Sequence, residues 1–360
     1  MIKNPYNIFF PTPDFLSRPS FGIDISDESL KYIQLISSRD GIRTGKYGEK
    51  KIPPGIIEAG RIIDPEKIQD ILMSLKKEVG IKSVRVSMLE NQIYLFRFKL
   101  PKSGLVSVRE GIELSLEEHI PVPALEAIFD YEIIEETKDD LDLQVVAIPK
   151  GIIESYLAVF KDCDILVHSF ELEAQAIARS VIPKGDIGTY MIVDFGEKRT
   201  GIFIISHGIV SFTSTLDVGG VLLNRMIQKN FKVNFEEADK IKKMYGLERN
   251  APNKEIFSVL LNSVSILRDE LVKHFTYWDT HKDEEGKGNP PIKKIILCGG
   301  DSNLIGLADY LSVSMKTEVS MANVWVNLLD TEKYIPIIPL KEALSFAAAI
   351  GLALGDFENE

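Results

Sequence analysis

The chain has 360 residues, too many for one ordinary hydrophobic core, so two or three subdomains are expected. Hydrophobic residues make up 45% of it and charged residues 26%, a balance typical of globular proteins rather than disordered ones. The formal net charge of −11 leaves no basic surplus for general binding to a nucleic-acid backbone.

Cys163 and Cys298 lie far apart in the sequence, which disfavours a disulfide framework and a structural zinc site. The five histidines show no metal-ligand spacing. The first twenty residues contain prolines but no apolar segment of the signal-peptide kind. The longest apolar tract, residues 343–355, is shorter than the ~20 residues that cross a bilayer. We therefore expect a cytoplasmic protein with a buried last helix.

The first part of the chain is predicted to contain a hairpin after an extended leader at 1–19. The hairpin covers 21–35, and a third strand follows near 44–52. Asp64-Pro65 is a typical helix start, and Gly80 ends the apolar 3.6-residue period that follows it. A strand at 83–89 completes this β-β-β-α-β order.

The pattern changes over residues 93–164, which we interpret as a small inserted α+β unit. Its predicted elements are a strand at 93–100, a helix at 108–120, strands at 129–134 and 143–149, and a helix at 151–160. An exposed strand of this unit could accept an added strand or helix from a partner.

The second part of the chain repeats the opening order. Its predicted elements are a helix at 169–181, a hairpin at 190–206, a strand from 210, helices over 222–280, a buried strand at 294–298 that enters a Gly-Gly turn, and a small-residue helix at 343–354.

Each hairpin carries one aspartate inside an apolar strand, Asp24 in the first and Asp194 in the second. A buried carboxylate costs several kcal/mol unless its charge is compensated. Two such turns can cradle a polyphosphate with backbone N–H groups while the carboxylates hold Mg²⁺ through water. Gly299-Gly300 would let the backbone approach a nucleoside closely. For either aspartate alone, a local turn cap is the alternative.

This ordered set resembles the superfamily of actin, sugar-kinase and heat-shock-chaperone ATPases. The insertion, of the SHS2-like type, resembles that of FtsA division proteins and of type IV pilus assembly proteins of the PilM family. The resemblance covers roughly residues 20–355. It rests on GIDISDESLKYIQL from Gly22, HIPVPALEAIFDYEII at 119–134, VVAIPKGIIESYL at 145–157, LDVGG at 216–220 and the last helix.

The resemblance implies that ATP and Mg²⁺ bind between two lobes. The residues that it places at the nucleotide are Asp24, Ser26 and Lys31 in the first hairpin, Asp194, Gly196, Lys198 and Thr200 in the second, Gly219 and Gly220 after it, Asp239 and Lys242 beside the ribose, and Gly299, Gly300 and Asp301 at the adenosine. Asp24 and Asp194 would hold the metal through water. Glu173 is the candidate acid near an attacking water, with slow ATP hydrolysis at best.

The chain also departs from the family pattern. Ser26 replaces a turn glycine and is followed by Asp27 and Glu28, whose charges would repel a triphosphate. Glu197, Lys198 and Arg199 replace small residues, so they either block the phosphate or contact it with two cations. Asp301 replaces a third glycine. These changes leave ATP binding open.

The implied fold class is α/β, a two-lobed actin-like ATPase fold of duplicated ribonuclease-H-like domains with the α+β insertion. The expected parts are a leader at 1–19, a first lobe at 20–92 completed by 165–189 and 341–357, the insertion at 93–164, and a second lobe at 190–340.

The implied function is a cytoplasmic nucleotide-binding adaptor of the type IV pilus machine, held at the inner face of the membrane by its partners. Its partner would be the N-terminal tail of a PilN-like inner-membrane protein, within a complex that includes the pilus motor; self-association is also open. The alternatives are a scaffold that binds no nucleotide, an FtsA-like division protein and a sugar kinase. The acidic ending GDFENE disfavours an FtsA-like membrane helix.

Overall fold

The fold was analysed in a computed structural model, which describes residues 20–38, 41–102, 107–248, 254–281, 286, 288–328 and 335–357. The leader expected at 1–19 lies outside the described residues. The chain forms two compact units: unit 1 comprises Met1–Ala176 and Ala348–Glu360, and unit 2 comprises Ile177–Ala347. Residues 341–347, expected with the first lobe, therefore belong to unit 2, and so do residues 177–189, which were also expected there. The Asn327 amide holds residues 177–189 in unit 2 by donating to the carbonyls of Arg179 and Ile182 at 2.8 and 2.6 Å.

Unit 1 is built on a five-stranded sheet in the order β10-β6-β1-β2-β3. Its strands are β1 (Phe21–Ile25), β2 (Ser29–Ser38), β3 (Gly41–Lys51), β6 (Ser83–Met88) and β10 (Leu166–Leu172). The first three are antiparallel, whereas β1, β6 and β10 run parallel. A short hairpin of β4 (Ile57–Glu58) and β5 (Arg61–Ile62) follows β3.

Strand β10 corrects one prediction, because the helix expected from residue 169 begins only at Glu173, as α5 (Glu173–Val181). The preceding residues pair with β6, with Phe170 opposite Val86 and Leu172 opposite Met88. Pairing with a strand far away in the sequence thus overrides the local helical pattern.

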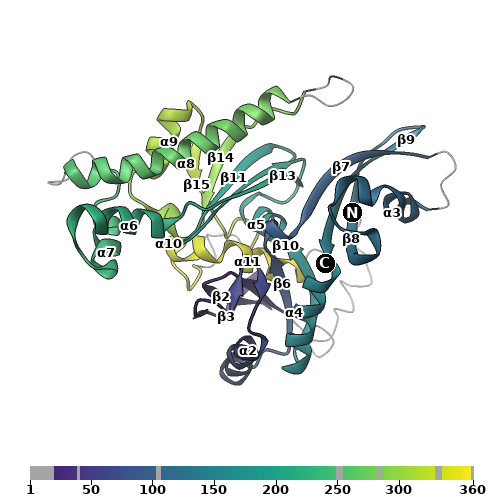
Figure 1. The fold of residues 1–360 in the computed structure, drawn as a ribbon, viewed down its shortest axis with the longest axis horizontal. Coiled ribbons are helices and arrows are strands. Elements are labelled where there is room, and N and C mark those ends of the chain that lie inside the picture. The colour runs from purple at the N-terminus through teal and green to yellow at the C-terminus, as the bar shows by residue number, and fades with distance from the viewer. Residues whose placement is uncertain are drawn as a thin grey trace. The chain divides into compact units, whose positions relative to one another are not determined.

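Helices cover both faces of this sheet (Figure 1). On one face, α2 (Pro65–Val79) and α4 (Lys150–Asp162) bury Leu72, Leu75 and Phe160 against β1 and β6. Helix α2 has the predicted ends, since the Asp64 side chain accepts from Lys67 N at 3.2 Å and Gly80 is left-handed.

On the other face lies α11 (Ala347–Leu354). A Cβ on Gly22 would lie 2.0 Å from the Ala349 carbonyl oxygen, so only glycine allows this approach of strand and helix.

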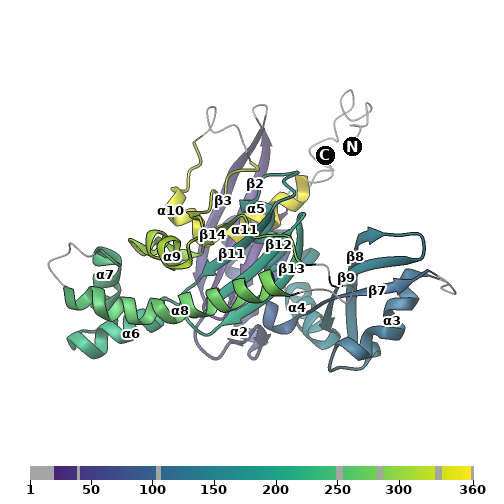
Figure 2. The same cartoon turned by 90° about the horizontal axis from the view of Figure 1, so that it is seen from above.

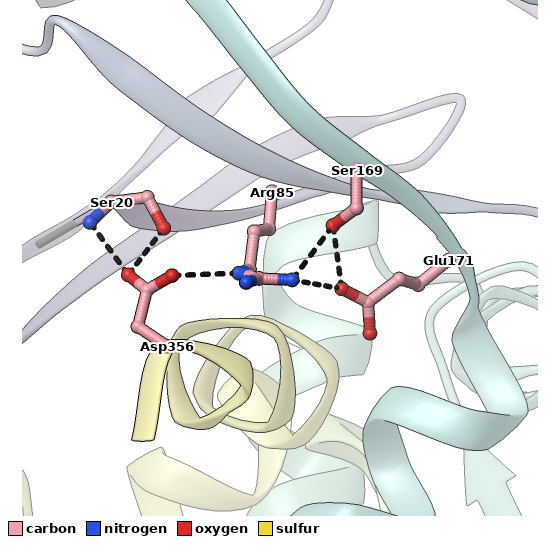
Figure 3. Close-up of polar contacts among 5 residues, drawn as sticks. All are labelled: Ser20, Arg85, Ser169, Glu171 and Asp356. Carbon is pink, nitrogen blue, oxygen red and sulfur yellow. Dashed lines mark hydrogen bonds and ion pairs between the residues drawn. The ribbon is translucent and has the colours of Figure 1, made fainter. Parts of the chain in front are cut away.

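A polar cluster fixes the end of the chain to the sheet (Figure 3). Asp356 accepts from the backbone N–H of Ser20 at 2.7 Å and from Arg85 Nε at 2.8 Å. Arg85 Nη1 also donates to Ser169 Oγ and to Glu171 Oε1, both at 3.1 Å. Four segments that are distant in the sequence are therefore joined through the Arg85 guanidinium group and the Asp356 carboxylate.

The insertion is a three-stranded antiparallel sheet in the order β7-β9-β8, covered on one face by α3 (Figure 2). Its elements are β7 (Tyr94–Pro101), α3 (Val108–His119), β8 (Ala127–Glu136) and β9 (Asp140–Pro149). Ile112 and Leu116 of α3 pack on Leu143 and Val145 of β9. The predicted order of elements in this region is confirmed, but the helix expected to close the insertion at 151–160 is α4, whose buried side chains pack in the core of unit 1.

Unit 2 contains a second five-stranded sheet, in the order β13-β12-β11-β14-β15. Its strands are β11 (Thr189–Phe195), β12 (Thr200–Ser206), β13 (Ile209–Leu216), β14 (Lys294–Cys298) and β15 (Val319–Met321). Its helices are α6 (Gly220–Phe231), α7 (Phe235–Tyr245), α8 (Lys254–Thr280), α9 (Leu307–Met315) and α10 (Leu340–Ala343). The long helix α8 runs along one face of the sheet (Figure 2). Strand β15 and helix α9 were not predicted.

Among the residues that the structure describes, no helix combines the length and the apolar character needed to span a bilayer.

Candidate functional site

Asp24 lies near the carboxyl end of β1 and is 7% exposed. Its Oδ1 accepts a 2.7 Å hydrogen bond from Ser87 Oγ, and that hydroxyl accepts in turn from Ile25 N at 3.3 Å. Ser87 is near the carboxyl end of the neighbouring parallel strand β6. The buried carboxylate is thus held by a hydroxyl that the sequence analysis did not single out.

The turn after Asp24 is closed by its own serine. Ser26 Oγ accepts from the backbone N–H groups of Glu28 and Ser29 at 3.3 and 3.1 Å. Ser26 N donates to the Ser29 carbonyl at 2.9 Å. Three N–H groups of the first turn are therefore used within the turn. Lys31, the other predicted residue here, donates to Ser29 Oγ at 3.2 Å and lies 3.8 Å from Glu49.

Asp27 stabilises a neighbouring turn of unit 1. Its two carboxylate oxygens accept from Ala59 N and Gly60 N, both at 3.1 Å. Ala59 and Gly60 connect β4 to β5 and both have positive φ, 50° and 78°, so their N–H groups form a small anion-binding concavity. These two hydrogen bonds hold the Asp27 carboxylate at the turn between β4 and β5, although its negative charge remains.

Glu173 is the first residue of α5 and directly follows β10, so it lies at the same edge of the sheet as the carboxyl ends of β1 and β6. A second carboxylate, missed in the sequence, lies at the start of the same helix. Glu90 is 8% exposed and accepts from Ala174 N at 2.7 Å. A negative group at a helix N-terminus is favourable. Glu90 therefore fixes the start of α5, which carries the candidate acid.

The second turn, in unit 2, is closed like the first by one N–H group, because Gly196 N donates to the Arg199 carbonyl at 2.9 Å, but two of its carbonyl oxygens also bind α6. The carbonyls of Gly196 and Glu197 accept from Gly220 N at 3.1 Å and Val221 N at 2.8 Å, in the first turn of α6. In a planar trans peptide the N–H points opposite to the C=O. The N–H groups of Glu197 and Lys198 are therefore directed away from α6.

Two predicted residues support this arrangement. A Cβ on Gly219 would lie 2.5 Å from the Glu197 carbonyl oxygen, so glycine allows α6 to approach the turn. Thr200 is fully buried, and its hydroxyl donates to the Val218 carbonyl at 2.6 Å. The Thr200 hydroxyl thus binds the short segment that connects β13 to α6.

Asp194 lies near the carboxyl end of β11, beside β14. The Cys298 thiol is 3.7 Å from Asp194 Oδ1. Gly299 follows with φ +87°, and a Cβ there would lie 2.5 Å from the same carboxylate oxygen. Gly299 N donates to the Leu344 carbonyl at 3.0 Å. The turn predicted for a nucleoside therefore packs directly against the aspartate predicted for the metal, while Gly300 is exposed.

The remaining predicted residues form an ionic cluster around Lys242. Lys242 Nζ donates to Asp301 Oδ1 at 2.6 Å, lies 3.2 Å from Asp239 Oδ1, and is 3.5 Å from the Gly220 carbonyl oxygen. The side chain of Lys242 is only 5% exposed. A capping box of Asn234 and Glu237 starts α7 and so fixes the turn that carries Asp239 and Lys242.

Burial raises the pKa of Asp301, and the neighbouring Asp239 and Glu197 act in the same direction, whereas Lys242 lowers it. Burial also acts to raise the pKa of Asp239, but Lys243 and Lys242 outweigh it, so that this pKa is lowered. Asp239 is therefore the more acidic of the two carboxyl groups.

Asn224 belongs to the same cluster and was also missed. It lies on α6, is 3% exposed, and donates from Nδ2 to Asp239 Oδ1 at 3.3 Å. Its buried Oδ1 has no hydrogen-bond partner among the described residues. In the sequence, Asn224 could have been linked to the site only because it lies four residues, about one helical turn, after Gly220 in α6.

In the described part of the chain, no three His, Cys, Asp or Glu side chains gather closely enough to hold a metal ion by themselves. Mg²⁺ commonly binds one or two carboxylates together with phosphate oxygens and water. The single carboxylates Asp24 and Asp194 fit that kind of donor set.

Comparison with known proteins identifies relatives over nearly the whole chain. The family described as type IV pilus assembly protein PilM matches residues 22–357. A solved PilM-PilN type IV pilus biogenesis complex contains a chain with a TM-score of 0.77 and 19% identity, covering 95% of this chain and 99% of that one.

Two further solved structures are similar. MreB5 of Spiroplasma citri bound to ADP has a TM-score of 0.57 and 15% identity, over 95% of this chain and 97% of that one. Ethanolamine utilization protein EutJ from Carboxydothermus hydrogenoformans has a TM-score of 0.55 and 16% identity, over 96% and 91%. These likenesses confirm the predicted actin-like α/β fold.

Proposed function

Because this chain belongs to the PilM family of type IV pilus assembly proteins, we propose that it is a nucleotide-binding adaptor of that machinery. It binds ATP with Mg²⁺ and captures the N-terminal tail of a PilN-like inner-membrane protein. Through that partner it is held at the cytoplasmic face of the membrane. Hydrolysis is slow, and Glu173 is the acid proposed for it.

The second turn carries the nucleotide-binding part of the proposal. With the carbonyls of Gly196 and Glu197 bound to α6, the next two N–H groups point to the opposite side of the turn. Successive N–H groups with this orientation bind anions. The cationic side chains of Lys198 and Arg199 belong to the same turn and add positive charge. The ADP bound to the similar MreB5 supports a phosphate as the anion.

Asp194 in unit 2 and Asp24 in unit 1 are each proposed to bind Mg²⁺ through water. Bound Mg²⁺ would neutralise phosphate charge. Ser87 keeps the Asp24 carboxylate oriented at the carboxyl end of β1, and Gly299 allows close packing beside Asp194.

The partner part of the proposal rests on the insertion and on the similar chain of the PilM-PilN complex. Both outer strands of the insertion sheet, β7 and β8, pair on one side only within the described residues. Such edges can accept an extended peptide.

Calorimetric titration of Mg-ATP tests nucleotide binding. We expect micromolar binding by the unaltered protein, a loss of at least tenfold in Asp194→Asn, and no change in Asp279→Asn, which alters an exposed carboxylate of α8 equally. Absence of binding up to millimolar concentration would instead favour the scaffold without nucleotide.

Capture of a synthetic PilN-like N-terminal peptide tests the insertion. Leu114 of α3 and Ile133 of β8 are 78% and 48% exposed, whereas Met244 of unit 2 is 65% exposed and serves as the control. Leu114→Glu or Ile133→Glu should weaken capture, while Met244→Glu and Asp194→Asn should not. Equal losses in Asp194→Asn and the insertion variants would contradict two separate sites.

A further inference from the structure

Asp301 lies directly beside Lys242 and contacts its ammonium group. Its carboxylate lies against Gly220: a Cβ on that glycine would be 2.1 Å from Asp301 Oδ2 and 2.2 Å from Oδ1. Asp301 therefore fits only because residue 220 has no side chain. The side chain of Asp301 is 14% exposed and accepts the shortest hydrogen bond that Lys242 makes, at 2.6 Å.

All three acceptors described around Lys242 Nζ belong to the protein, namely Asp301, Asp239 and the Gly220 carbonyl. An ammonium group has three donors. The amine is thus saturated from within and nearly buried, so an external acceptor can reach it only by displacing one of these groups.

Asp301 is the group most easily displaced. Asp239 is also bound by Lys243 at 2.6 Å and by Asn224, and its pKa is lowered, so its charge is well compensated. The Gly220 carbonyl is part of α6. Within the described residues, Asp301 instead forms an ion pair with Lys242 alone, and it faces Asp239 and Glu197, two groups of like charge.

The cluster also has an unused acceptor. Asn224 Oδ1 is buried and has no partner in the described part of the structure, although the Nδ2 of the same amide binds Asp239. A buried acceptor without a donor costs about 1–3 kcal/mol. A ligand hydroxyl, or a rearranged Lys242, would remove this cost. Lys242 therefore has acceptors for its donors, whereas the Asn224 carbonyl oxygen has no donor among the described residues.

We propose that Asp301 competes with a nucleotide for the Lys242 amine. A nucleotide can contact Lys242 only after the Asp301 carboxylate has moved away. This inference rests on the proposed nucleotide binding and adds a mechanism that limits it. The competing group is part of η3 (Gly300–Asn303), which Gly299 connects to strand β14. Binding and opening of the ion pair are thereby coupled.

The first test measures the reactivity of the Lys242 amine without any nucleotide. Lysines are labelled with a limiting amount of an acylating reagent, and the labelled positions are quantified by mass spectrometry. Lys243 is an internal reference, because it is 72% exposed and follows in the same helix. In Asp301→Gly we expect the Lys242-to-Lys243 labelling ratio to rise at least tenfold, with a smaller rise in Asp301→Asn. Asp309→Asn, an exposed carboxylate on α9, should leave the ratio unchanged.

The second test titrates Mg-ATP into the same proteins. We expect Asp301→Gly to bind at least tenfold more tightly than the unaltered chain and to regain protection of Lys242 when Mg-ATP is present. Asp301→Asn keeps the shape of the side chain but removes its charge, so it replaces Asp301→Gly in this titration if the glycine variant does not fold.

The outcomes separate the two proposals. An unchanged labelling ratio, or equal Mg-ATP affinity in all proteins, would overturn the role of Asp301 while nucleotide binding stands. Binding by Asp301→Gly alone would support the competitor and contradict nucleotide binding by the native chain. Absence of binding in every protein would overturn both.

Discussion

The two strand–turn–strand motifs are closed by the same hydrogen bond, from Ser26 N to the Ser29 carbonyl and from Gly196 N to the Arg199 carbonyl, but their other turn groups are bound differently. The turn of unit 1 uses its N–H groups internally, on Ser26 Oγ and the Ser29 carbonyl. The turn of unit 2 gives its carbonyls to α6 and directs N–H groups the other way. A turn whose donors are already bonded is a poor phosphate cradle. Under the proposed function, the orientation of the Glu197 and Lys198 N–H groups and the two cationic side chains favour unit 2 for the main phosphate contacts.

The side chains of the two turns also differ in charge, since the first turn is acidic and the second carries two cations. Unit 1 carries Asp27, which binds the Ala59-Gly60 turn, whereas unit 2 carries Lys198 and Arg199. The acidic substitution thus has a structural role in its own unit, and the basic pair belongs to the turn with outward N–H groups.

The largest expected effect comes from breaking the anchor of the second turn. In Gly219→Ala the new Cβ would meet backbone atoms of Glu197 and Lys198 at 2.5 Å, so the turn must shift. We expect a loss of about 1–3 kcal/mol in the free energy of unfolding and a loss of Mg-ATP binding, measured by urea denaturation and calorimetry. Gly151→Ala is the matched control, because a Cβ in α4 meets nothing within 4 Å. Unchanged stability and affinity in Gly219→Ala would contradict the assigned anchor.

A smaller effect is expected from the first turn. Asp27→Ala removes the acceptor of two N–H groups and should lower the free energy of unfolding by about 1–2 kcal/mol, since hydrogen bonds to charged groups are the stronger ones. Mg-ATP affinity should change by less than threefold. Adding Ala59→Gly should restore about 1 kcal/mol, because glycine has no cost at positive φ.

Chemical denaturation of these variants, with Asp139→Ala as an exposed control, checks this expectation. A tenfold gain in affinity with unaltered stability would show that Asp27 acts on the ligand instead.

The smallest effect is a pH dependence within unit 2. Burial raises the pKa of Asp301 in the folded chain, so the folded state holds this proton more tightly than the unfolded state. Its contribution to stability is complete below the ordinary aspartate pKa of about 3.9 and is lost as pH rises through the raised value. The unaltered chain should therefore lose stability relative to Asp301→Asn over that interval, as measured by urea denaturation at several pH values.

The same titration bears on nucleotide binding. Lys242, Asp239 and Glu197 are the charged groups that face Asp301. Protonation of Asp301 weakens its hold on Lys242, so Mg-ATP affinity should rise as pH falls through the raised pKa, and this rise should be absent in Asp301→Asn. An identical pH profile for both proteins would contradict the internal competitor.

Local patterns were sufficient for most of the fold. The two hairpins, the capped helix α2 and the order of the insertion follow from apolar periodicity and from Asp64, Pro65 and Gly80. Strand β10 was missed because it is stabilised by parallel pairing with β6, which no local pattern reveals. Helix α9 and the three-residue strand β15 lack strong local signals of their own.

The site was less predictable because its contacts join distant residues. The positions of Asp24 and Asp194 near strand ends follow from their motifs, but the hydroxyl of Ser87 and the carboxylate of Glu90 come from other segments. The pairing of Lys242 with Asp301 depends on how α7 packs beside the turn after β14. The sequence showed that residue 301 departs from a glycine run, but not where its charge would be placed.

The polar cluster around Arg85 also bears on the order in which the chain folds during synthesis. Unit 1 needs both the strand that begins at Phe21 and the helix that ends before Asp356, and Arg85 joins them. Unit 2 is one continuous segment and is complete once residue 347 has left the ribosome. Domains generally form as units while the chain emerges. Unit 1, whose strands are synthesised first, is therefore completed last. Its sheet can reach its final packing only after the segment from Ala348 to Asp356 has been synthesised.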